Sequence, residues 1–424
     1  MSGAWVFSGA RRLEIHAACD FLPPPQLPGG RDVAQAVGAA LAQPVAAPRL
    51  RELARGAARA AITIPDSSRS CPNDVILPAL LNELNAAGVS DERVLVAVGC
   101  GLHRTTTAAE RRTLAGEVAA ARAKVVDAHG IETPQTDLGV TSLGCPVSLC
   151  AEVAACDLII SVGVLEPHQC AGYSGGVKGL AVGCAGERTI LWTHRPAFIS
   201  LPGVELCRLD GNPFQETLRE MAARTGLRFA VTAIVNDAGG VAAVAAGDPA
   251  AVQEHLAARF ASAWLATVAK PYNLIVAGIK APKHESLYQA SRAATYIGLA
   301  ARPALTPDGL ILLCSDLPKG PGDGPGETNF AAVLAAAGSP SELAARGLRE
   351  PLGPGGHRAF LVARVLERFR VGVLGGADES LLAPLGIARF STLGEAVATE
   401  HRALRRAPRI LAVADALTTV IRTA

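Results

Sequence analysis

Several features that mark large classes of protein are scarce in this sequence. Aromatic residues make up only 4% of the 424 residues, and no apolar run reaches the roughly 20 residues that a membrane-spanning helix needs. The 40 basic and 38 acidic residues nearly balance, to a net charge of +2, and form no block of one sign. These absences argue against a membrane-spanning protein and against nucleic acid as the main partner.

Cysteines with the spacing of a metal site are also missing. The ten cysteines form no Cys-x-x-Cys pair, so they indicate neither a zinc ribbon nor a thioredoxin-like redox site. We expect them to be small buried hydrophobic residues in a reducing compartment. The first residues lack the charged and then apolar pattern of a secretion signal, so a cytoplasmic enzyme is expected.

Apolar runs that end in glycine-rich or polar loops recur along the chain. The runs at 94–98, 157–164 and 273–278 are typical of buried strands in parallel sheets, and they alternate with helical segments. We therefore predict the α/β class, with mainly parallel sheets in two domains, 1–270 and 271–424. Ligands of such folds bind at the carboxyl ends of the strands. We expect the active site in the cleft between the two domains.

The segment 166–194 concentrates most of the candidate chemistry. It follows a predicted strand and combines His168, Lys178 and His194 with a dense series of glycines. Glycine has no Cβ, so a turn of this kind lets the backbone approach a ligand closely. Neither residue beside Lys178 fits the Walker phosphate loop, which needs Gly before the lysine and Ser or Thr after it.

Polar residues also follow two earlier predicted strands. Asp66, Ser67, Ser68 and Arg69 come after the strand at 61–64, in a loop that could simply begin the next helix, with Ser70 as its N-cap and Pro72 in its first turn. A helix start of this kind can also bind an anion.

A histidine follows the next predicted strand. His103 comes directly after the run at 94–98 and a Gly-x-Gly step, which lacks the third glycine of a dinucleotide-binding loop. An imidazole at such a strand end can act as acid or base near neutral pH.

Together these motifs resemble the nickel-pincer lactate racemase family. The matching features are a proline–histidine step at His168, a Gly-x-Ser-Gly-Gly-x-Lys turn that ends at Lys178, and a further histidine at His194. A Gly-x-His-Arg step at His103 and an Asp-x-x-Arg turn that ends at Arg69 also match.

The resemblance implies a complete catalytic scheme. The activity would be racemisation or epimerisation of a 2-hydroxy acid by reversible hydride transfer to the cofactor, with His103 and His168 as acid and base. The cofactor would be a nickel-pincer nucleotide, a Ni(II) pyridinium-3,5-bisthiocarboxylate mononucleotide, linked to Lys178 and with His194 as the protein ligand to nickel. Proteins of cofactor biosynthesis would be transient partners. The residues implied to contact the cofactor are Asp66, Ser67, Ser68 and Arg69.

The resemblance also assigns residues to the substrate. Arg69, Tyr288, Gln289 and Arg292 would contact it, with Tyr288 and Gln289 in a Leu-Tyr-Gln-Ala step that could otherwise be an ordinary helix start. The lactate enzymes have lysine where this chain has Arg292. Arginine offers a planar fork and lysine a point charge, so a larger or dicarboxylic 2-hydroxy acid is a further candidate substrate.

Two other functions remain open from the sequence. His103, His168 and His194 could instead be three ligands of a zinc hydrolase or lyase, a scheme that leaves Lys178 without a role. A non-catalytic protein could use the same cleft to bind an anionic metabolite.

Overall fold

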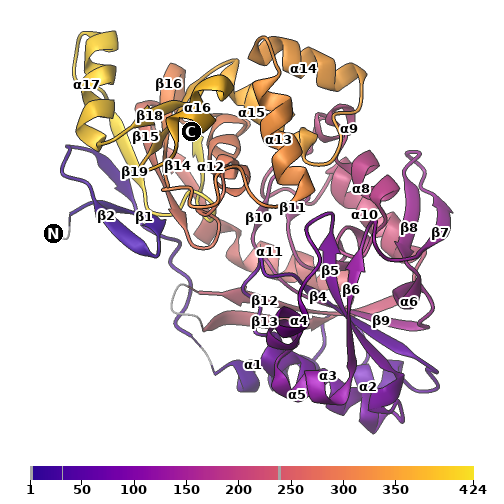
Figure 1. Cartoon of the computed structure of the whole chain (residues 1–424). Helices are drawn as coiled ribbons and strands as arrows, with labels where there is room; N and C mark the ends of the chain where they lie inside the picture. The colour runs from indigo at the N-terminus through magenta and orange to yellow at the C-terminus, as the bar shows by residue number, and fades with distance from the viewer. Residues whose placement is uncertain (1–2, 31, 237–239) are drawn as a thin grey trace. The chain divides into compact units, whose positions relative to one another are not determined.

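The computed structural model describes residues 3–30, 32–236 and 240–424 of the chain (Figure 1). In this part of the chain, no helix is both long and apolar enough to span a bilayer. Contacts between residues divide the chain into two compact units, each with its own central sheet. Unit 1 comprises Met1–Gln26, Arg195–Ala197 and Ser262–Ala424, and unit 2 comprises Leu27–His194 and Phe198–Ala261.

Unit 2 is built on a six-stranded sheet in the order β13-β12-β9-β4-β5-β6. β12 and β13 pair antiparallel, and the remaining neighbours pair parallel. The inner strands are apolar over nearly their whole length, as expected where helices cover both faces of a sheet. The strands are β4 (Ala60–Pro65), β5 (Val94–Gly101), β6 (Lys124–His129), β9 (Leu158–Val164), β12 (Leu227–Val235) and β13 (Val241–Gly247).

Helices cover the two faces of this sheet with different side chains. On one face, large residues such as Ile62 and Val96 pack in a core that also takes residues from α1, α3 and α5 (Figure 1). On the other face, smaller residues such as Ala61 and Ala97 pack against Leu180 of α7. The helices are α1 (Val33–Ala42), α2 (Leu50–Leu53), α3 (Asn73–Ala86), α4 (Ala108–Ala115), α5 (Glu117–Arg122), α6 (Ala151–Ala154), α7 (Lys178–Ala181), α8 (Glu187–Thr193), α10 (Pro213–Ala223) and α11 (Pro249–Trp264).

The short helix α7 lies unusually close to the sheet. Thr63 and Ser161 face each other across β4 and β9 beneath Gly179, and a Cβ on Gly179 would come within 2.8 Å of Ser161 Oγ. A Cβ on Gly99 would likewise come within 3.1 Å of the backbone of Gly183. Small residues on both surfaces therefore permit this approach.

Unit 1 is built on an eight-stranded, mainly parallel sheet. Its main path is β18-β17-β16-β15-β1-β2, and β19 pairs with β15 and β3. α12 (Leu287–Gly298) packs against β16 and against α15 (Gly356–Leu366), and α15 also contacts α13 (Pro325–Ala335) and α14 (Pro340–Arg349). The strands are β1 (Trp5–Gly9), β2 (Arg11–Glu14), β3 (Asp20–Leu22), β15 (Tyr272–Lys280), β16 (Leu305–Cys314), β17 (Arg370–Leu374), β18 (Ala388–Phe390) and β19 (Ile410–Val413).

The predicted α/β class with mainly parallel sheets is confirmed. The first 26 residues differ from the expected division at residue 270, because β1 pairs with β15 and β3 pairs with β19, so these residues group with the carboxyl-terminal part of the chain. The sequence of 248–268 predicts one helix, but α11 ends at Trp264, and Leu265–Val268 forms strand β14, which pairs with β20 (Val420–Thr423). The turn residues at 236–240 predict a hairpin between 229–235 and 241–244, and β12 and β13 form it, although residues 237–239 lie outside the described residues.

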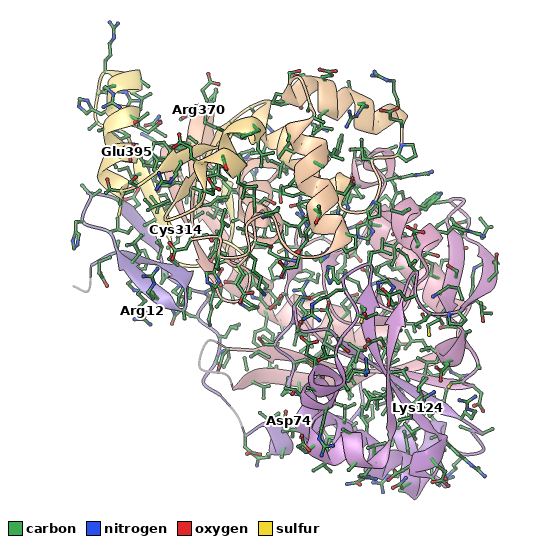
Figure 2. The ribbon with its side chains drawn as sticks, viewed as in Figure 1. Arg12, Asp74, Lys124, Cys314, Arg370 and Glu395 are labelled. Carbon is green, nitrogen blue, oxygen red and sulfur yellow. The ribbon has the colours of Figure 1, made fainter. Side chains whose placement is uncertain are left out.

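The cysteines behave as the sequence predicted. None of the ten, all of which the structure describes, forms a disulfide, and most are buried. Cys314, for example, lies within β16 in the core of unit 1 (Figure 2). Its apolar surroundings raise the pKa of the thiol to about 12, so it stays uncharged and inert at neutral pH.

Candidate functional site

Three of the predicted polar motifs follow neighbouring strands of unit 2. The turn at 66–69 follows β4, His103 follows β5, and His168 follows β9. These strands are adjacent in the order β9-β4-β5 and run parallel, so their carboxyl ends lie at one edge of the sheet. The topology therefore brings the three motifs to the same edge.

His103 is held by a carboxylate from the neighbouring strand end. Its Nδ1 lies 2.7 Å from Asp66 Oδ2, and Ser68 donates to Asp66 Oδ1 from its backbone N at 3.1 Å and from its Oγ at 2.5 Å. A carboxylate only accepts hydrogen bonds, so Nδ1 carries the proton and Nε2 is the atom that can exchange one.

The charge of Asp66 is secured by these same contacts. Burial alone would raise its pKa, but the His103 ring and the hydrogen bonds from His103 and Ser68 outweigh burial and lower the pKa from 3.8 to about 2. Asp66 therefore remains an anion at neutral pH. The sequence indicated Asp66 as a cofactor contact, and its partner in the structure is an imidazole.

Arg69 joins the end of β4 to the end of β9. Its backbone N donates to Asp66 O at 3.2 Å, and its guanidinium forms an ion pair with Glu166. Both side chains are largely shielded from solvent, with 14% and 27% of their surface exposed. No sequence signal indicates a role for Glu166, the first residue of the segment 166–194, because its partner lies 97 residues away along the chain. Ser67, at the outer side of the turn, is exposed.

His168 lies in a short hairpin formed by β10 (Pro167–His168) and β11 (Gly172–Tyr173). Its Nδ1 accepts hydrogen bonds from the backbone N of Cys170 at 3.3 Å and of Ala171 at 3.2 Å. An Nδ1 that accepts cannot carry a proton, so this neutral ring has its proton on Nε2. The two predicted catalytic histidines are thus held in opposite tautomers.

Lys178 begins α7, directly after the glycine turn. Gly175 and Gly176 have φ angles of +77° and +53°, a conformation that strongly favours glycine. The backbone N of Lys178 closes the turn by donating to Gly175 O at 3.1 Å. The lysine side chain is half-buried, as expected for a residue that emerges from a close-packed turn.

His194 directly follows α8. Its Nδ1 lies 2.9 Å from the carbonyl of Ile190 and 3.0 Å from Thr193 Oγ1, and its ring meets Phe214 edge-on at 5.4 Å. A carbonyl only accepts, so Nδ1 carries the proton and Nε2 keeps its lone pair. Metal-binding histidines are commonly oriented in this way by a backbone carbonyl. The tautomer of His194 therefore fits a nickel ligand.

The three histidines do not form a zinc site. Within the described ranges, no group of three or more His, Cys, Asp or Glu residues is arranged to hold a metal ion. A zinc enzyme of the predicted kind needs three protein ligands around one ion. The arrangement therefore does not support the zinc hydrolase or lyase.

The predicted substrate residues of unit 1 lie on the first turns of α12. Ser286 caps this helix by accepting from the backbone N of Gln289 at 3.3 Å. Arg292 is 8% exposed and donates to Gln289 Oε1 at 3.3 Å and to Tyr296 Oη at 2.9 Å. The predicted residues Gln289 and Arg292 are therefore in contact with each other, within one helix.

A second buried arginine lies beside these residues. The Arg358 guanidinium of α15 lies 5.6 Å from the centre of the Tyr288 ring, and Arg358 is 9% exposed. No signal in the sequence indicated it, because it occupies a helix with no motif around it. Burial raises the pKa of Tyr288, so its hydroxyl stays protonated.

Comparisons with known proteins agree with these motifs. Residues 10–205 match the family model described as the lactate racemase N-terminal domain. The lactate racemase of Thermoanaerobacterium thermosaccharolyticum is 25% identical over 392 residues, which cover 90% of this chain and 89% of that protein. The lactate racemase of Lactiplantibacillus plantarum is 25% identical over 394 residues, covering 92% and 91%.

Solved structures show the same fold. The apoprotein of lactate racemase from T. thermosaccharolyticum superposes with a TM-score of 0.88 at 22% identity, covering 99% of this chain and all of that one. A protein from Thermotoga maritima superposes with a TM-score of 0.66 at 13% identity, covering 88% and 96%. The family model and the two relatives thus make this chain similar to the lactate racemases over most of its length.

Proposed function

We propose that this chain interconverts the stereoisomers of a 2-hydroxy acid at the edge of the unit 2 sheet. Its relatives are named lactate racemase, so the chain is an enzyme of the isomerase class. The observation that carries the proposal is the hydrogen bond between Asp66 and His103. It lies at the same edge of the sheet as His168. A racemase needs acid–base groups for both stereoisomers, and two imidazoles at one edge meet that need.

The two imidazoles have different tasks in this proposal. Asp66 stabilises the protonated ring of His103, so His103 takes the hydroxyl proton of the substrate at Nε2. His168 presents its Nε2 proton as a hydrogen-bond donor. His168 becomes a base only when its ring gives up the hydrogen bonds from Cys170 and Ala171. Proton transfer through His168 is therefore coupled to movement of this ring or of its turn.

We assign the cofactor to two residues of unit 2. Lys178 would hold the nickel-pincer nucleotide as a thioamide, and His194 would ligate nickel through Nε2. This assignment is supported by the tautomer of His194 and by the glycine turn before Lys178, in which backbone can approach a bulky group closely. When bound, the nickel-pincer nucleotide supplies a hydride acceptor.

The identity of the substrate, a 2-hydroxy acid, depends on the residues of α12. Gln289 and Arg292 are assigned to the substrate carboxylate by the family motif, and Arg292 stands where the lactate enzymes have lysine. A buried guanidinium favours a planar, bidentate contact with a carboxylate. We therefore propose that the substrate is a 2-hydroxy acid. The acids to be tested include larger and dicarboxylic ones beside lactate.

The proposal is tested with cofactor-loaded protein and a panel of single-enantiomer 2-hydroxy acids in deuterated water. We expect optical rotation to fall to zero for the substrate, with its α-hydrogen largely retained, because hydride transfer does not exchange it with solvent. Full α-deuteration would instead show ordinary proton abstraction and would exclude the hydride mechanism.

Two further outcomes decide the remaining points. Binding of the acids without any loss of optical rotation would support the non-catalytic alternative. The cofactor assignment predicts nickel in the purified protein and a mass increment on the peptide that contains Lys178. Zinc without such an increment would contradict that assignment.

A further inference from the structure

Two glutamine side chains form a hydrogen-bonded pair in the interior of unit 2. Gln215 lies in α10 and Gln253 in α11, and each is 0% exposed. Gln215 Nε2 donates to Gln253 Oε1 at 2.7 Å. Buried amides are costly unless they are hydrogen-bonded, so their presence in an apolar interior calls for a role.

Gln253 uses its amide nitrogen to hold the glycine turn. Its Nε2 donates to the carbonyls of Tyr173 and Ser174, each at 3.2 Å. These are the last two carbonyls before Gly175, where the turn that ends at Lys178 begins. The side chain of Gln253 therefore supports the turn from a position 75 or more residues away along the chain.

The direction of the amide pair follows from its partners. Two backbone carbonyls can only accept, so Gln253 must present its NH₂ group to them and its oxygen to the other side. Gln215 donates to that oxygen. Removing the Gln215 donor would leave a buried acceptor on Gln253 without its partner, which is itself unfavourable.

The backbone of α11 also touches the turn closely. A Cβ on Gly176 would lie 2.8 Å from Pro249 O and 3.1 Å from Gln253 Cβ, and a Cβ on Gly175 would lie 2.9 Å from Thr232 Cγ2. The backbone N of Gly176 also reaches Thr232 Oγ1 at 3.5 Å. The position of the turn is therefore set by the start of α11 and by β12.

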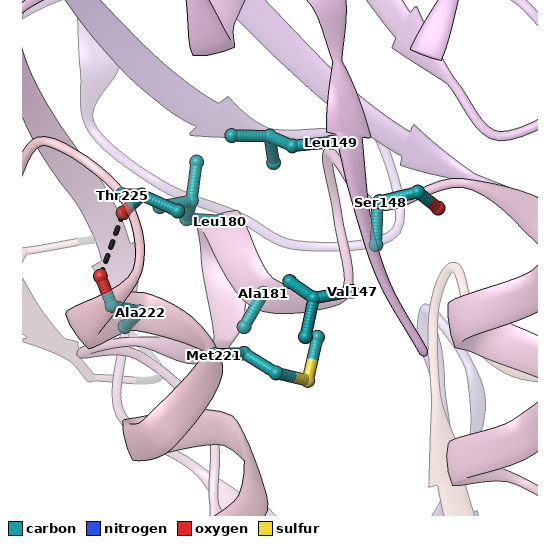
Figure 3. A pocket seen from close by; sticks show the side chains of 9 residues that line it. Val147, Ser148, Leu149, Leu180, Ala181, Met221, Ala222 and Thr225 are labelled. Carbon is teal, nitrogen blue, oxygen red and sulfur yellow. Dashed lines mark hydrogen bonds between the residues drawn. The ribbon is translucent and has the colours of Figure 1, made fainter. Parts of the chain in front are cut away.

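Apolar packing around α7 is less complete. A small pocket lies between α7, α10 and the strand β8 (Pro146–Cys150), as Figure 3 shows. Leu180, Ala181, Val147 and Met221 are among its lining residues. α7 has only four residues, so hydrogen bonds to the turn before it can contribute to where the helix begins.

We propose that Gln253, oriented by Gln215, is a positioning residue for Lys178. Its two hydrogen bonds to the turn fix the point from which the lysine side chain leaves the backbone. The inference rests on the proposed function, in which Lys178 is the attachment point of the cofactor. The alternative is that the pair only stabilises unit 2, in which case its loss would lower stability without a specific effect on Lys178.

The test compares Gln253→Glu, Gln253→Met and Gln215→Met in the full-length, cofactor-free protein. Gln253→Glu keeps the shape and the acceptor but replaces the donor with an oxygen that repels the two carbonyls. The control is Asn273→Leu, which removes a buried amide in unit 1 that donates to Thr306 Oγ1 at 3.2 Å and accepts from Arg409 N at 2.9 Å.

Two site-specific measurements report on the lysine. The first is the rate at which acetic anhydride modifies Lys178, measured by peptide mass spectrometry relative to the exposed Lys124. The second is deuterium exchange of the amides at 175–178. We expect both rates to rise about tenfold in Gln253→Glu and Gln253→Met. The loss of one hydrogen bond lowers the local stability of the turn by an amount that corresponds to about this factor in rate. Gln215→Met should give a smaller rise, and Asn273→Leu should leave both rates at the wild-type value.

Rates in Gln253→Glu that equal those of the wild type would overturn the proposal. An equal rise in Asn273→Leu would also overturn it, because general destabilisation would then explain the effect. In the loaded enzyme we expect Gln253→Met to lower kcat about 10- to 100-fold with KM changed less than about threefold, as for a misplaced reacting group. If the wild-type protein racemises no 2-hydroxy acid, the proposed function fails, but the modification and exchange rates still decide the role of Gln253.

Discussion

The side chains at the edge of the unit 2 sheet depend on their partners more than on their own chemistry. An imidazole has two nitrogens, and the group that meets Nδ1 decides what Nε2 can do. For His103 that group is a carboxylate, and for His168 it is a pair of backbone amides. The same residue type is therefore held in two different tautomers at the same end of the sheet.

The substitution Asp66→Asn tests this dependence. Asparagine can present its NH₂ group to His103 and stabilise the wrong tautomer, and it cannot stabilise the protonated ring by charge. We expect kcat to fall by about 10² or more, since positioned acid–base catalysis contributes factors of that size. Turnover of the loaded enzyme measures the effect.

The same substitution should change how stability depends on pH. The pKa of Asp66 is lowered to about 2 in the folded chain, so the unfolded chain binds a proton more tightly. The stabilisation is therefore present above about pH 4 and is lost as the pH falls towards 2. Denaturant titrations at pH 6 and pH 3 should show a larger difference between wild type and Asp66→Asn at pH 6.

A matched carboxylate lies at the opposite edge of the sheet. Asp157 precedes β9 and accepts from the backbone N of Ala58 at 2.9 Å and of Arg59 at 2.8 Å, and these hydrogen bonds lower its pKa. Asp157→Asn should lose stability with the same dependence on pH and keep its activity. If Asp157→Asn lost as much activity as Asp66→Asn, the effect could not be assigned to His103.

The sequence predicts candidate site residues, but it does not predict which groups they contact. The turn at 66–69, His103 and His168 each follow a strand, as an apolar run followed by a polar turn indicates, whereas Lys178 begins α7 and His194 follows α8. Whether Arg69 meets a substrate or Glu166 depends on two segments far apart in the sequence. Arg358 and Gln253 lie within helices that have no recognisable motif. Their contacts with the predicted site residues or the glycine turn are therefore visible only in the structure.

The turns between the elements carry the strictest requirements of the fold. Gly172 lies opposite His168 in the hairpin of β10 and β11, with a φ of +73°. A Cβ at this position would come within 1.9 Å of Arg208 O, which is backbone and cannot move alone. The glycine therefore fixes the position of the hairpin that carries His168, one of the two proposed acid–base residues.

We expect Gly172→Ala to destabilise the protein by about 3 kcal/mol or more, from backbone strain together with overpacking. The control is Gly144→Ala: Gly144 also has a positive φ, of +83°, but no atom lies within 4 Å of an added Cβ. That change should cost only about 1 kcal/mol, the strain of the left-handed conformation alone. Denaturant unfolding measures both, and equal losses would show that the contact with Arg208 has no effect.

Strands with continuous apolar runs were predicted correctly, and short polar strands were not. β4, β5, β9 and β15 are almost wholly buried and contain the expected residues. β2, β7 (Gln135–Val140) and β8 include exposed or polar positions, so their sequences do not differ clearly from loops. Such strands form because a partner strand is available, and this is decided by the fold as a whole.

At the scale of the whole molecule, the two ends of the chain meet in one unit. β1 pairs with β15 at Ser8–Ile279 and Gly9–Lys280, and β3 pairs with β19. Val6 and Ile15 are buried in the same core as residues of β15 and β19. Pairing over more than 250 residues leaves no local signal, so the sequence alone placed these strands with the nearer domain.

Deletion of residues 1–22 tests which unit these strands support. The deletion removes β1, β2 and β3, which leaves β15 and β19 with unpaired backbone groups and opens the core around Val6. We expect deuterium exchange in β15 and β19 to rise about 10- to 100-fold, because local stability falls, while exchange in β4 and β9 stays within about threefold of the wild type. The substitution Glu14→Gln, at an exposed position in β2, serves as the control and should change neither region. A rise confined to β4 and β9 would instead support the division at residue 270, with the first strands as part of the amino-terminal domain.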